Sequence, residues 1–572
     1  MKTRIACRRS ICLAVVVGTI WGMPWRTPTA TGQILLVDEF DGTHGNAAFH
    51  PGGVVDVTSY RVPFGGTNGD DFVGRTNFRF TLPQDGVATA AAGSTDGKVA
   101  VLNLDTYNPN APGSTFLGTD VISKRNYGVG GGLRMTTRMR VQSGTPGGLV
   151  AAPFLYDVQR ESPPGTLVRD EIDHEIITNF AQSAAPDNTL TNVWNDGNFA
   201  SAGAPVTISN PPGFDVTQFH DYRTDWSPTS VKYYIDNSLV RTETAVVPND
   251  PMRAHLNFWA PDASFAAAYN AGLAPSASSP GTTYKVEVDR MQIERLNTTV
   301  SSNLLADASF EGFDTPPSGI GGWAQFGNVF REGGPVTPQD GFAALKMFGP
   351  FFNLPNASGV FQNVPAAPGQ QFEGSVYAYS PSGDSILGTQ NYTNITLQFL
   401  NAQGQVLDSV NFSPGRNEKN TPIFDGRDAN MPQDNWIQYT VDAVAPADTA
   451  FVRESLFFIQ QLSQGGAVWF DNASLVRLTP DVVAVPGDYN SNGLVDAADY
   501  VVYRNSVGLA TLTNRGSGIV GPVGSADYNF WRSRFGSTSP GSGVSVASIP
   551  EPGTLVLLVL LPFAALGCRR RR

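Results

Sequence analysis

The segment from Arg169 to Ile177 constrains the fold of this chain more than any other. It places three acidic residues, Glu171, Asp173 and Glu175, at alternate positions among largely β-branched residues. Successive side chains of a β-strand point to opposite faces, so the three carboxylates share one face of a strand. Like charges at this spacing repel and raise one another's pKa values, which a purely structural strand has no reason to accept. The pattern therefore predicts a functional strand.

Three carboxylates on one face suit the hydrolysis of a glycosidic bond. Hydrolysis with retention needs two carboxyl groups about 5–5.5 Å apart, one as nucleophile and one as general acid and base. On a flat strand the Cα atoms of Glu171 and Glu175 stand roughly 13 Å apart. A concave sheet is therefore needed to tilt the two side chains together, and Asp173 between them would make the three acids titrate as one coupled set. The alternative is an acidic, solvated edge strand.

The Glu-Ile-Asp-x-Glu pattern resembles the catalytic strand of glycoside hydrolase family 16, the group of laminarinases, lichenases, agarases and carrageenases. Further segments resemble the family in the same order across residues 34–296: Val37 to Gly42, Arg138 to Arg140, Gly147 to Tyr156, Phe219 to Trp226, Val231 to Asn237, Pro251 to Trp259 and Val286 to Met291. The resemblance implies a concanavalin-like jelly-roll sandwich with a glycan on its concave face. It also implies that Glu171 is the nucleophile, Asp173 its assisting carboxylate and Glu175 the general acid/base.

One position departs from the family pattern within the acidic strand. His174 stands where the family usually has an apolar residue. Because it alternates with the acids, it should face the core or the convex side. We interpret it as a buried histidine whose hydrogen bonds are satisfied.

A glycan cleft needs aromatic platforms for the apolar faces of sugar rings and a few polar groups for the hydroxyls. The candidate substrate-binding residues are Trp194, Asn195, His220, Asn257 and Trp259. Burial in the core is the alternative for the two tryptophans, and it fits His220 as well as the cleft does. Phe258 alternates with Asn257 and Trp259 and is expected in the core.

The remaining sequence fits an exported protein that is mainly β. It has 572 residues with 60 Gly and 41 Pro, and only 15% of the residues are charged. Residues 1–32 combine basic residues, the apolar run 11–20 and small residues, as a secretory signal peptide does. The three cysteines are Cys7, Cys12 and Cys568, so the mature protein is predicted to have no disulfide.

The net charge disfavours nucleic acid as a partner. Residues 1–30 contribute +5 and residues 550–572 contribute +3 to a net charge of −12, which leaves −20 for the rest of the chain. An acidic surface mainly favours solubility. It also argues weakly against a strongly anionic polymer as substrate.

A second β-sandwich is predicted over residues 303–477, after a Thr/Ser-rich linker at 298–302. Its first and last segments, Asn303 to Glu311 and Val468 to Leu475, resemble carbohydrate-binding modules of families 4 and 9. The resemblance implies a domain that holds the enzyme on its polymer, and a structural spacer is the alternative. Three aromatic residues could contact ligand or pack in the core: Trp323, Phe326 and Phe330.

Residues 488–499 have the spacing of a calcium-binding loop, with oxygen-bearing side chains at positions one, three, five, nine and twelve and Gly at six. The predicted ligands of one Ca²⁺ are Asp488, Asn490, Asn492, Leu494 through its carbonyl, Asp496 and Asp499. Residues 486–536 resemble a dockerin repeat, a small α-helical, EF-hand-like module. A second copy of the helix begins near Asp527 without an acidic loop. A cohesin-like partner and a module without a partner both remain open.

The C-terminal residues 550–572 follow a linker at 537–549. They contain Pro-Glu-Pro, an apolar run of about 14 residues and four arginines, and they resemble PEP-CTERM sorting signals. The run is shorter than the ~20 residues of a stable membrane span, and the arginines predict a cytoplasmic end. We expect a transient membrane contact that ends in cleavage; a permanent anchor is the alternative.

These expectations combine into one hypothesis. The chain is an extracellular or cell-surface retaining endo-glycosidase for a β-glucan or an algal galactan, and its catalysis needs no cofactor. One alternative is an inactive, lectin-like glycan-binding protein. A structural matrix protein bound through residues 303–477 and the dockerin-like module is the other. The complete set Glu171, Asp173 and Glu175 argues against both.

Overall fold

A computed structural model gives the structure of most of the chain. The described residues are 32–43, 53–63, 75–83, 93–161, 166–181, 188–197, 203–312, 322–411, 421–480, 485–489, 495–512, 514–516 and 518–537. The predicted signal peptide, linker and sorting tail lie outside them, apart from residues 32 and 537. In the described part of the chain every helix falls short of the length and apolar character that crossing a bilayer requires.

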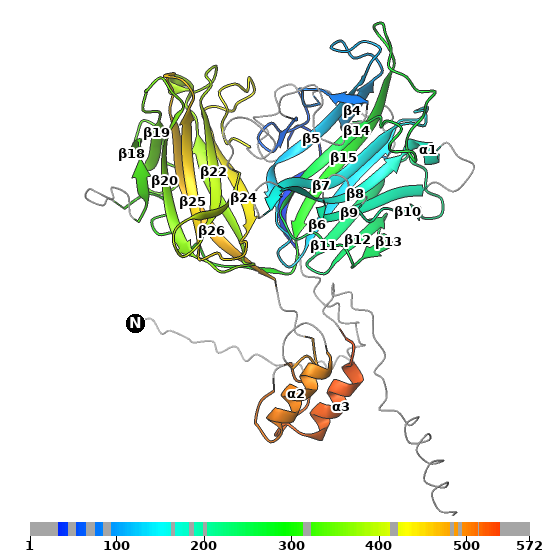
Figure 1. The fold of residues 1–572 in the computed structure, drawn as a ribbon, viewed down its shortest axis with the longest axis vertical. Helices are drawn as coiled ribbons and strands as arrows, with labels where there is room; N and C mark the ends of the chain where they lie inside the picture. Colours follow the sequence, from blue (N-terminus) through cyan, green and yellow to red (C-terminus); the bar gives the residue numbers. More distant parts are fainter. Residues whose placement is uncertain are drawn as a thin grey trace, which may run out of the picture. The chain divides into compact units, whose positions relative to one another are not determined.

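The first part of the chain forms one nearly closed sheet of 15 strands, folded into a jelly-roll sandwich. The strands are β1 (Gln33–Asp38), β2 (Tyr60–Arg61), β3 (Thr76–Phe78), β4 (Ala100–Asp105), β5 (Phe116–Tyr127), β6 (Leu133–Val141), β7 (Val150–Glu161), β8 (Thr166–Ile177), β9 (Asn188–Gly197), β10 (Val206–Ser209), β11 (His220–Ser227), β12 (Ser230–Ile235), β13 (Ser238–Glu243), β14 (Met252–Trp259) and β15 (Thr283–Arg295). Their order is β10-β9-β8-β7-β14-β5-β4-β15-β6-β11-β12-β13 (Figure 1). The prediction of a mainly β jelly-roll is confirmed.

The sheet passes from one layer to the other along β5. This strand of 12 residues pairs with β14 and, at Leu117, with β4. One layer therefore runs from β10 to β5, and the other runs from β4 to β13. Strand β1 adds to β15, and the short strands β2 and β3 add to β5.

The core between the two layers follows the period of two that strands impose. On β14, Met252, Ala254, Leu256 and Phe258 are buried in this core, as predicted for Phe258. On β8 the core residues include Ile172 and Ile176. The odd-numbered residues of both strands, the three acids among them, therefore point away from the core on the outer face of their layer.

Two further sheets pack around a second core. Their strands are β16 (Thr298–Val300), β17 (Ala324–Phe326), β18 (Asn328–Glu332), β19 (Ala344–Phe348), β20 (Asn356–Pro365), β21 (Gln371–Tyr379), β22 (Tyr392–Leu400), β23 (Val406–Val410), β24 (Trp436–Val444), β25 (Phe451–Gln460) and β26 (Val468–Pro480). One sheet has the order β18-β19-β26-β21-β24 with β16 beside β26, and the other has the order β17-β20-β25-β22-β23. A 3-10 helix spans Ser382–Asp384.

The second core settles the position of one of the three aromatic residues that could contact ligand or pack in the core. Trp323 is 1% exposed and belongs to this core. Phe326 and Phe330 are exposed. The segment predicted as a Thr/Ser-rich linker is instead partly strand, because β16 pairs with the end of β26 from Thr298 opposite Pro480 to Val300 opposite Leu478. The linker prediction was wrong at these positions, since pairing to a strand nearly 180 residues later leaves no local signal.

Two arginines of the jelly-roll strands bind two acids of the second pair of sheets. Arg295 Nη2 lies 2.7 Å from Glu373 Oε2 and 3.2 Å from Asp442 Oδ2. Arg125 Nη2 lies 2.5 Å from Glu373 Oε2 and 3.3 Å from Asp442 Oδ1. Asn126 adds two reciprocal hydrogen bonds of 2.8 Å with the backbone of Asp442. The four charges balance, which buried ions require.

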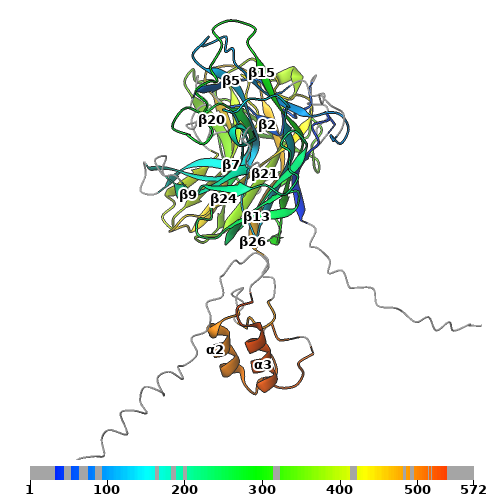
Figure 2. The same ribbon diagram turned by 90° about the vertical axis from the view of Figure 1, so that its right-hand side faces the viewer.

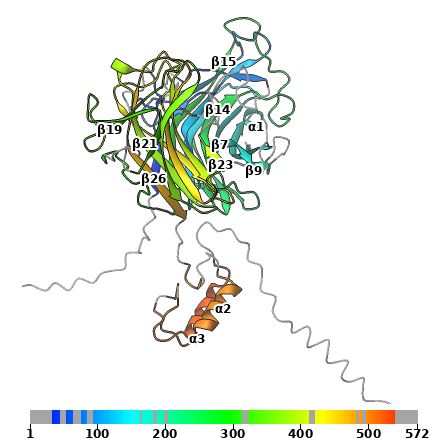
Figure 3. The ribbon, with the colours of Figure 1, turned by 60° about the vertical axis from the view of Figure 1, so that its left-hand side comes forward.

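The described residues contain three α-helices: α1 (Thr178–Ala181), α2 (Ala497–Ser506) and α3 (Ser525–Arg534). Helices α2 and α3 lie side by side (Figures 1, 2 and 3). Asp496 caps α2, since its side chain accepts a hydrogen bond from the Ala498 N–H and its own N–H donates to Asp499. A small core under the two helices contains Tyr489 and Trp531.

Candidate active site

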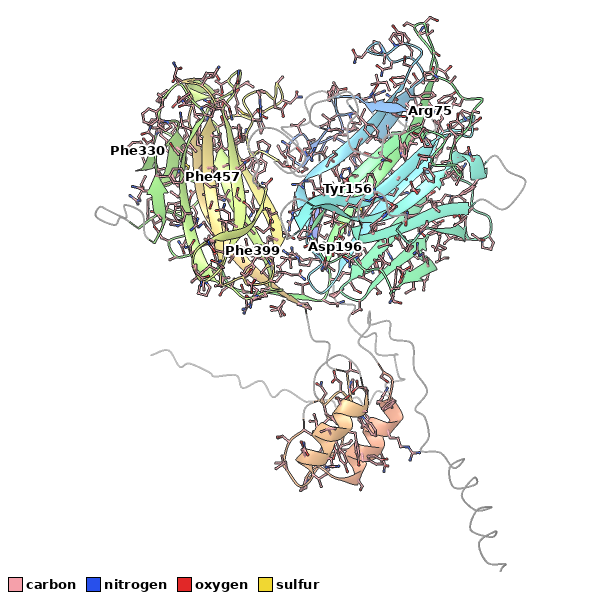
Figure 4. The ribbon with its side chains drawn as sticks, in the orientation of Figure 1. Arg75, Tyr156, Asp196, Phe330, Phe399 and Phe457 are labelled. Atoms are coloured by element: carbon pink, nitrogen blue, oxygen red, sulfur yellow. The ribbon has the colours of Figure 1, made fainter. Side chains whose placement is uncertain are left out.

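The three acids lie on β8, between β7 and β9. Glu171 stands opposite Tyr156 of β7 and Trp194 of β9. Asp173 stands opposite Phe154 and Asn192 in the same way. Figure 4 labels Tyr156 on β7 and Asp196 near the end of β9, the two strands that flank β8. The outer face of the layer thus carries the acids along its middle.

Burial sets the electrostatics of the acids. Glu171 and Asp173 are 6% and 5% exposed, whereas Glu175 is half-buried. Loss of hydration raises the pKa of Glu171 to about 7 and that of Glu175 to about 8. The pKa of Asp173 is raised well above its ordinary value by burial and by the charges of Glu171 and Glu175. Asp173 keeps its proton and donates a hydrogen bond to Glu171, which lowers the pKa of Glu171.

This ordering separates the chemical roles that two carboxyl groups can take. Glu171 loses its proton before Glu175 does as the pH rises. Near neutral pH the strand can therefore present one carboxylate and one carboxylic acid on the same face, the pair that glycoside hydrolysis needs.

His174 faces the opposite side of β8 from the acids. It is 1% exposed, and its ring lies edge-on to Tyr222 and Tyr233 at centroid distances of 5.1 and 5.7 Å. The burial predicted for it is confirmed. The expected hydrogen bonds are not present, because neither ring nitrogen has a hydrogen-bond partner among the described residues. Burial accordingly lowers the pKa of His174 to about 3, and the ring stays neutral.

Trp194 is beside the nucleophile candidate, but its ring already has neighbours. The Arg169 guanidinium lies 4.1 Å from the indole centroid. The backbone of Gly203 also approaches the indole so closely that a Cβ there would lie 2.6 Å from the ring. Trp194 is half-buried, and it stands opposite Glu171 with Arg169 over its ring. Asn195, the next residue, is exposed and alternates to the other face of β9.

Asn257 and Trp259 share the acid-bearing face two strands away from β8. Asn257 is 2% exposed, and its Oδ1 has no hydrogen-bond partner among the described residues. Trp259 is 6% exposed and packs with Phe265, 6.2 Å between centroids, in a small apolar cluster. For Trp259 the structure supports burial, the alternative to a platform, because a later segment of the chain covers the ring.

His220 does not belong with the acids. It lies on β11, in the opposite layer, on the same side as the core residue Tyr222. Its Nδ1 is 2.6 Å from Asp236 Oδ2, and its Nε2 is 2.9 Å from the carbonyl oxygen of Asp215. The ring stacks on Phe214 at 4.3 Å. Its prediction as a substrate-binding residue was wrong, because the sequence does not show that β11 pairs with β6 on the far side of the sandwich.

Sequence reasoning missed the residues that flank the acids on β14 and at the start of β8. The His255 ring lies 4.6 Å from that of Phe154, tilted by 32°, and its Nδ1 is 3.3 Å from Asp120 Oδ1. Arg169 Nη1 is 3.2 Å from Glu171 Oε2. Position alone signals Arg169, since it precedes Glu171 by two residues and so shares its face. His255 has no local signal, because the pairing of β14 with β7 joins residues about 100 positions apart.

The predicted calcium ligands are only partly within the described residues. Asp488 and Asp499 are fully buried, and Asp496 caps α2. Asn490, Asn492 and Leu494 lie outside the described residues. Within those residues no group of three or more His, Cys, Asp or Glu side chains is arranged to hold a metal ion. The carboxylate oxygens present do match the ligand chemistry that Ca²⁺ prefers.

Known proteins resemble the first part of this chain. The family model described as Glycosyl hydrolases family 16 matches residues 77–287, from β3 into β15. The β-glucanase of Paenibacillus polymyxa is 28% identical over 241 residues, which are 41% of this chain and 85% of that enzyme. The β-glucanase of Bacillus amyloliquefaciens is 29% identical over 138 residues, 24% of this chain and only 50% of that enzyme. In the structure of the Bacillus licheniformis β-glucanase, 99% of that chain aligns with 46% of this one at 19% identity and a TM-score of 0.32.

Proposed function

Residues 77–287 form a glycoside hydrolase family 16 domain, so this protein is a retaining O-glycosyl hydrolase, and we propose that it cleaves a β-linked glucan at internal linkages. One observation carries the proposal. Glu171, Asp173 and Glu175 share one face of β8. Burial raises the pKa of both glutamates, but the Arg169 charge and the Asp173 hydrogen bond lower that of Glu171, whereas the Glu171 charge raises that of Glu175 further. A strand with this arrangement offers both a nucleophile and a proton donor near neutral pH.

In the first step, the Glu171 carboxylate attacks the anomeric carbon and forms a covalent glycosyl ester. The bond from that carbon to the bridging oxygen breaks, and Glu175 gives its proton to the leaving oxygen. Asp173, still protonated, holds Glu171 through its hydrogen bond. The half-buried position of Glu175 leaves it open to the leaving group and later to water.

In the second step, the Glu175 carboxylate takes a proton from water. The water oxygen attacks the anomeric carbon, the ester to Glu171 breaks, and Glu175 is protonated again. Two inversions give net retention. The cycle needs no metal or cofactor, since both proton transfers and the nucleophile are supplied by β8.

β-Glucan is preferred over an algal galactan on two grounds. The two relatives described above are named β-glucanases. The chain is also strongly acidic between its termini, which disfavours sulfated or carboxylated galactans as polymers in contact with it. Reducing-end release should be measured on mixed-linkage β-glucan, β-1,3-glucan, agarose and carrageenan. We expect release from a β-glucan; release from a galactan alone would overturn the substrate assignment.

The alternative from another class is a glycan-binding protein without activity. The exposed rings of Phe326 and Phe330 in the second pair of sheets offer apolar surface for such binding. We propose that residues 303–477 hold the enzyme on its polymer, and that residues 486–536 bind one Ca²⁺ and form a dockerin-like module for a cohesin-like or cell-surface partner. A glycan array, combined with the polymer assay, distinguishes the hydrolase from the inactive glycan-binding protein. Binding to arrayed glycans with no polymer cut by the intact protein would favour the lectin-like alternative.

The terminal segments support a proposal about location. The N-terminal signal and the Pro-Glu-Pro tail suit an exported protein that contacts the membrane briefly during sorting. Mass spectrometry of the protein recovered from its native host tests this directly. Mature chains that begin after about residue 32 and end before residue 550 are expected, and intact termini would contradict it.

A further inference from the structure

We propose that Arg169 is a positioning residue, clamped by Trp194, that keeps the Glu171 carboxylate ionised and in place for attack. This inference rests on the proposed role of Glu171 as the nucleophile. In this inference Trp194 holds Arg169 and does not serve as the sugar platform that its position beside the acids suggested.

The contacts form a chain across two strands. Arg169 Nη1 is 3.2 Å from Glu171 Oε2, and the side chains of the two residues are only 10% and 7% exposed. The same guanidinium lies over the indole of Trp194 at 4.1 Å from the ring centroid. Stacking on an aromatic face holds a guanidinium plane without using its hydrogen-bonding edge. Trp194 thus fixes the plane from which Arg169 points at Glu171.

The charges around Glu171 give this contact its effect. Asp173 and Glu175 of β8 face it on the same strand, and Tyr156 of β7 stands opposite. Tyr233 of β12 lies in the core, where burial and, to a smaller extent, the charges of Asp173 and Glu171 raise its pKa. Among the described residues, Arg169 is the one cation whose charge acts on Glu171.

Arg169 acts mainly through charge. Glu171 Oε2 has no hydrogen-bond partner among the described residues, so its 3.2 Å approach to Arg169 is an ion pair rather than an aligned hydrogen bond. Burial raises the pKa of Glu171, and the charge of Arg169 lowers it. Without Arg169, the three acids would have no nearby positive charge to decide which of them ionises first.

The ring geometry separates this role from substrate stacking. Arg169 lies over the indole of Trp194, and the Gly203 backbone also packs closely against that ring. A sugar stacked on the indole would have to compete with the guanidinium. Removal of either Trp194 or Arg169 should therefore change the same property of Glu171.

The test compares Arg169→Met, Arg169→Lys and Trp194→Leu with the wild type, using the pH dependence of kcat/KM on a soluble β-glucan oligosaccharide. We expect the acid limb to move up by roughly one pH unit in Arg169→Met, which is about a tenfold loss below the limb. Arg169→Lys keeps a charge and should move the limb less. Trp194→Leu should move it in the same direction as Arg169→Met.

A matched control is Arg134→Met, which removes an arginine paired with Asp225 on the other layer and should leave the limb unchanged. An unmoved limb in Arg169→Met, with a fold that circular dichroism finds intact, overturns the proposal. A raised KM and an unmoved limb in Trp194→Leu would restore Trp194 as a sugar platform and would also overturn it.

Carboxyl carbon NMR titration gives a readout that needs no turnover. The Glu171 resonance, assigned by its loss in Glu171→Gln, should titrate at higher pH in Arg169→Met than in the wild type. A wild-type protein that cuts no glycan would refute the proposed function, yet this shift would still test the Arg169 contact. If the Glu171 resonance titrates at the same pH in both proteins, the proposed effect of Arg169 on Glu171 is wrong.

Discussion

Asp173 donates a hydrogen bond to Glu171 from the next position on the same face of β8. The bond exists only while Asp173 is protonated, and burial together with the charges of Glu171 and Glu175 raises the pKa of Asp173 well above its ordinary value. We therefore propose that Asp173 is a donor that holds the proposed nucleophile Glu171, and not a third base. Its own charge would repel Glu171, so its neutrality is part of the arrangement.

This relationship predicts that Asp173→Asn keeps more activity than Asp173→Ala. Asparagine retains an N–H donor of similar size, whereas alanine leaves Glu171 without its partner. A hydrogen bond to a charged group contributes about 1.5–3 kcal/mol, so Asp173→Ala should lose roughly 10- to 100-fold in kcat. Steady-state kinetics at one pH near neutrality measures both. Equal losses in the two variants would show that the hydrogen bond is not what matters at this position.

The pKa order predicts a narrow, bell-shaped dependence of kcat/KM on pH. Glu171 must be ionised, so activity rises as the pH passes about 7, and Glu175 must be protonated, so activity falls as the pH passes about 8. Both limbs lie above the range of ordinary carboxyl groups, because burial penalises the charged forms. Initial rates from pH 5 to 10 give the profile. An optimum near pH 5 would mean that water reaches these carboxyl groups more freely than the structure indicates.

The two glutamates should respond differently to an added nucleophile. Glu175→Ala loses the general base of the second step, and azide can attack the glycosyl ester without that base. We expect azide to restore turnover in Glu175→Ala on an activated aryl glycoside and to give the β-glycosyl azide. Glu171→Gln should stay inactive on natural glucans with its fold unchanged. Rescue of a Glu171→Ala variant, with an inverted azide product, and not of Glu175→Ala would reverse the two assignments.

The acid strand could be predicted from sequence because its signal is local. Glu171, Asp173 and Glu175 need only a period of two to share a face, and the same alternation places His174 inside. The jelly-roll class follows from many such strands. Phe258 was predicted in the core by the same rule.

The surroundings of the acids could not be predicted, because they depend on which strands become neighbours. Arg253 and His255 reach the acid face only since β14 inserts beside β7. His220 resembles a cleft residue until β11 is seen to pair with β6. Trp259 is covered by Phe265 from a loop without secondary structure. None of these pairings leaves a trace in the local pattern.

Asp442 should be important for stability although it lies far along the chain from the acids. It is 1% exposed and binds the equally buried Arg295 of β15, so its removal leaves a buried cation without one of its two partners. Loss of one partner from a buried ion pair costs about 3–5 kcal/mol. Asp442→Ala should therefore lower the free energy of unfolding by about this amount, measured by denaturant titration.

A surface acid provides the control for Asp442. Asp384 is 49% exposed and lies 3.7 Å from Lys346, so Asp384→Ala should change stability by less than about 1 kcal/mol. Similar small losses in the two variants would mean that the four charges contribute little. A large loss of unfolding free energy confined to Asp442→Ala would show that β15 and β24 unfold together as one cooperative unit.

Helices α2 and α3 each have an aspartate in the first turn. We expect the charges of these two aspartates to be neutralised by different cations. Asp499 accepts a hydrogen bond from the Asp496 N–H at 2.7 Å, and Asp527 accepts one from the Gly524 N–H at 2.9 Å. Both carboxylates are fully buried. At Asp527 the counter-charge is Arg515, whose Nε and Nη2 lie 2.5 and 2.8 Å from the two carboxylate oxygens.

We therefore expect one Ca²⁺ per chain, bound by the loop that ends at Asp499, and no second ion beside Asp527. Isothermal titration should give a stoichiometry of one. Chelation should speed amide hydrogen exchange across residues 485–537, because Trp531 of α3 donates to the Asp496 carbonyl and the two halves share a core. Arg515→Met should have the same effect with calcium present, unlike the exposed Arg532→Met. Hydrolysis should be unchanged in all these samples, since the proposed catalytic acids lie on β8; a parallel loss of activity would place a required metal elsewhere in the protein.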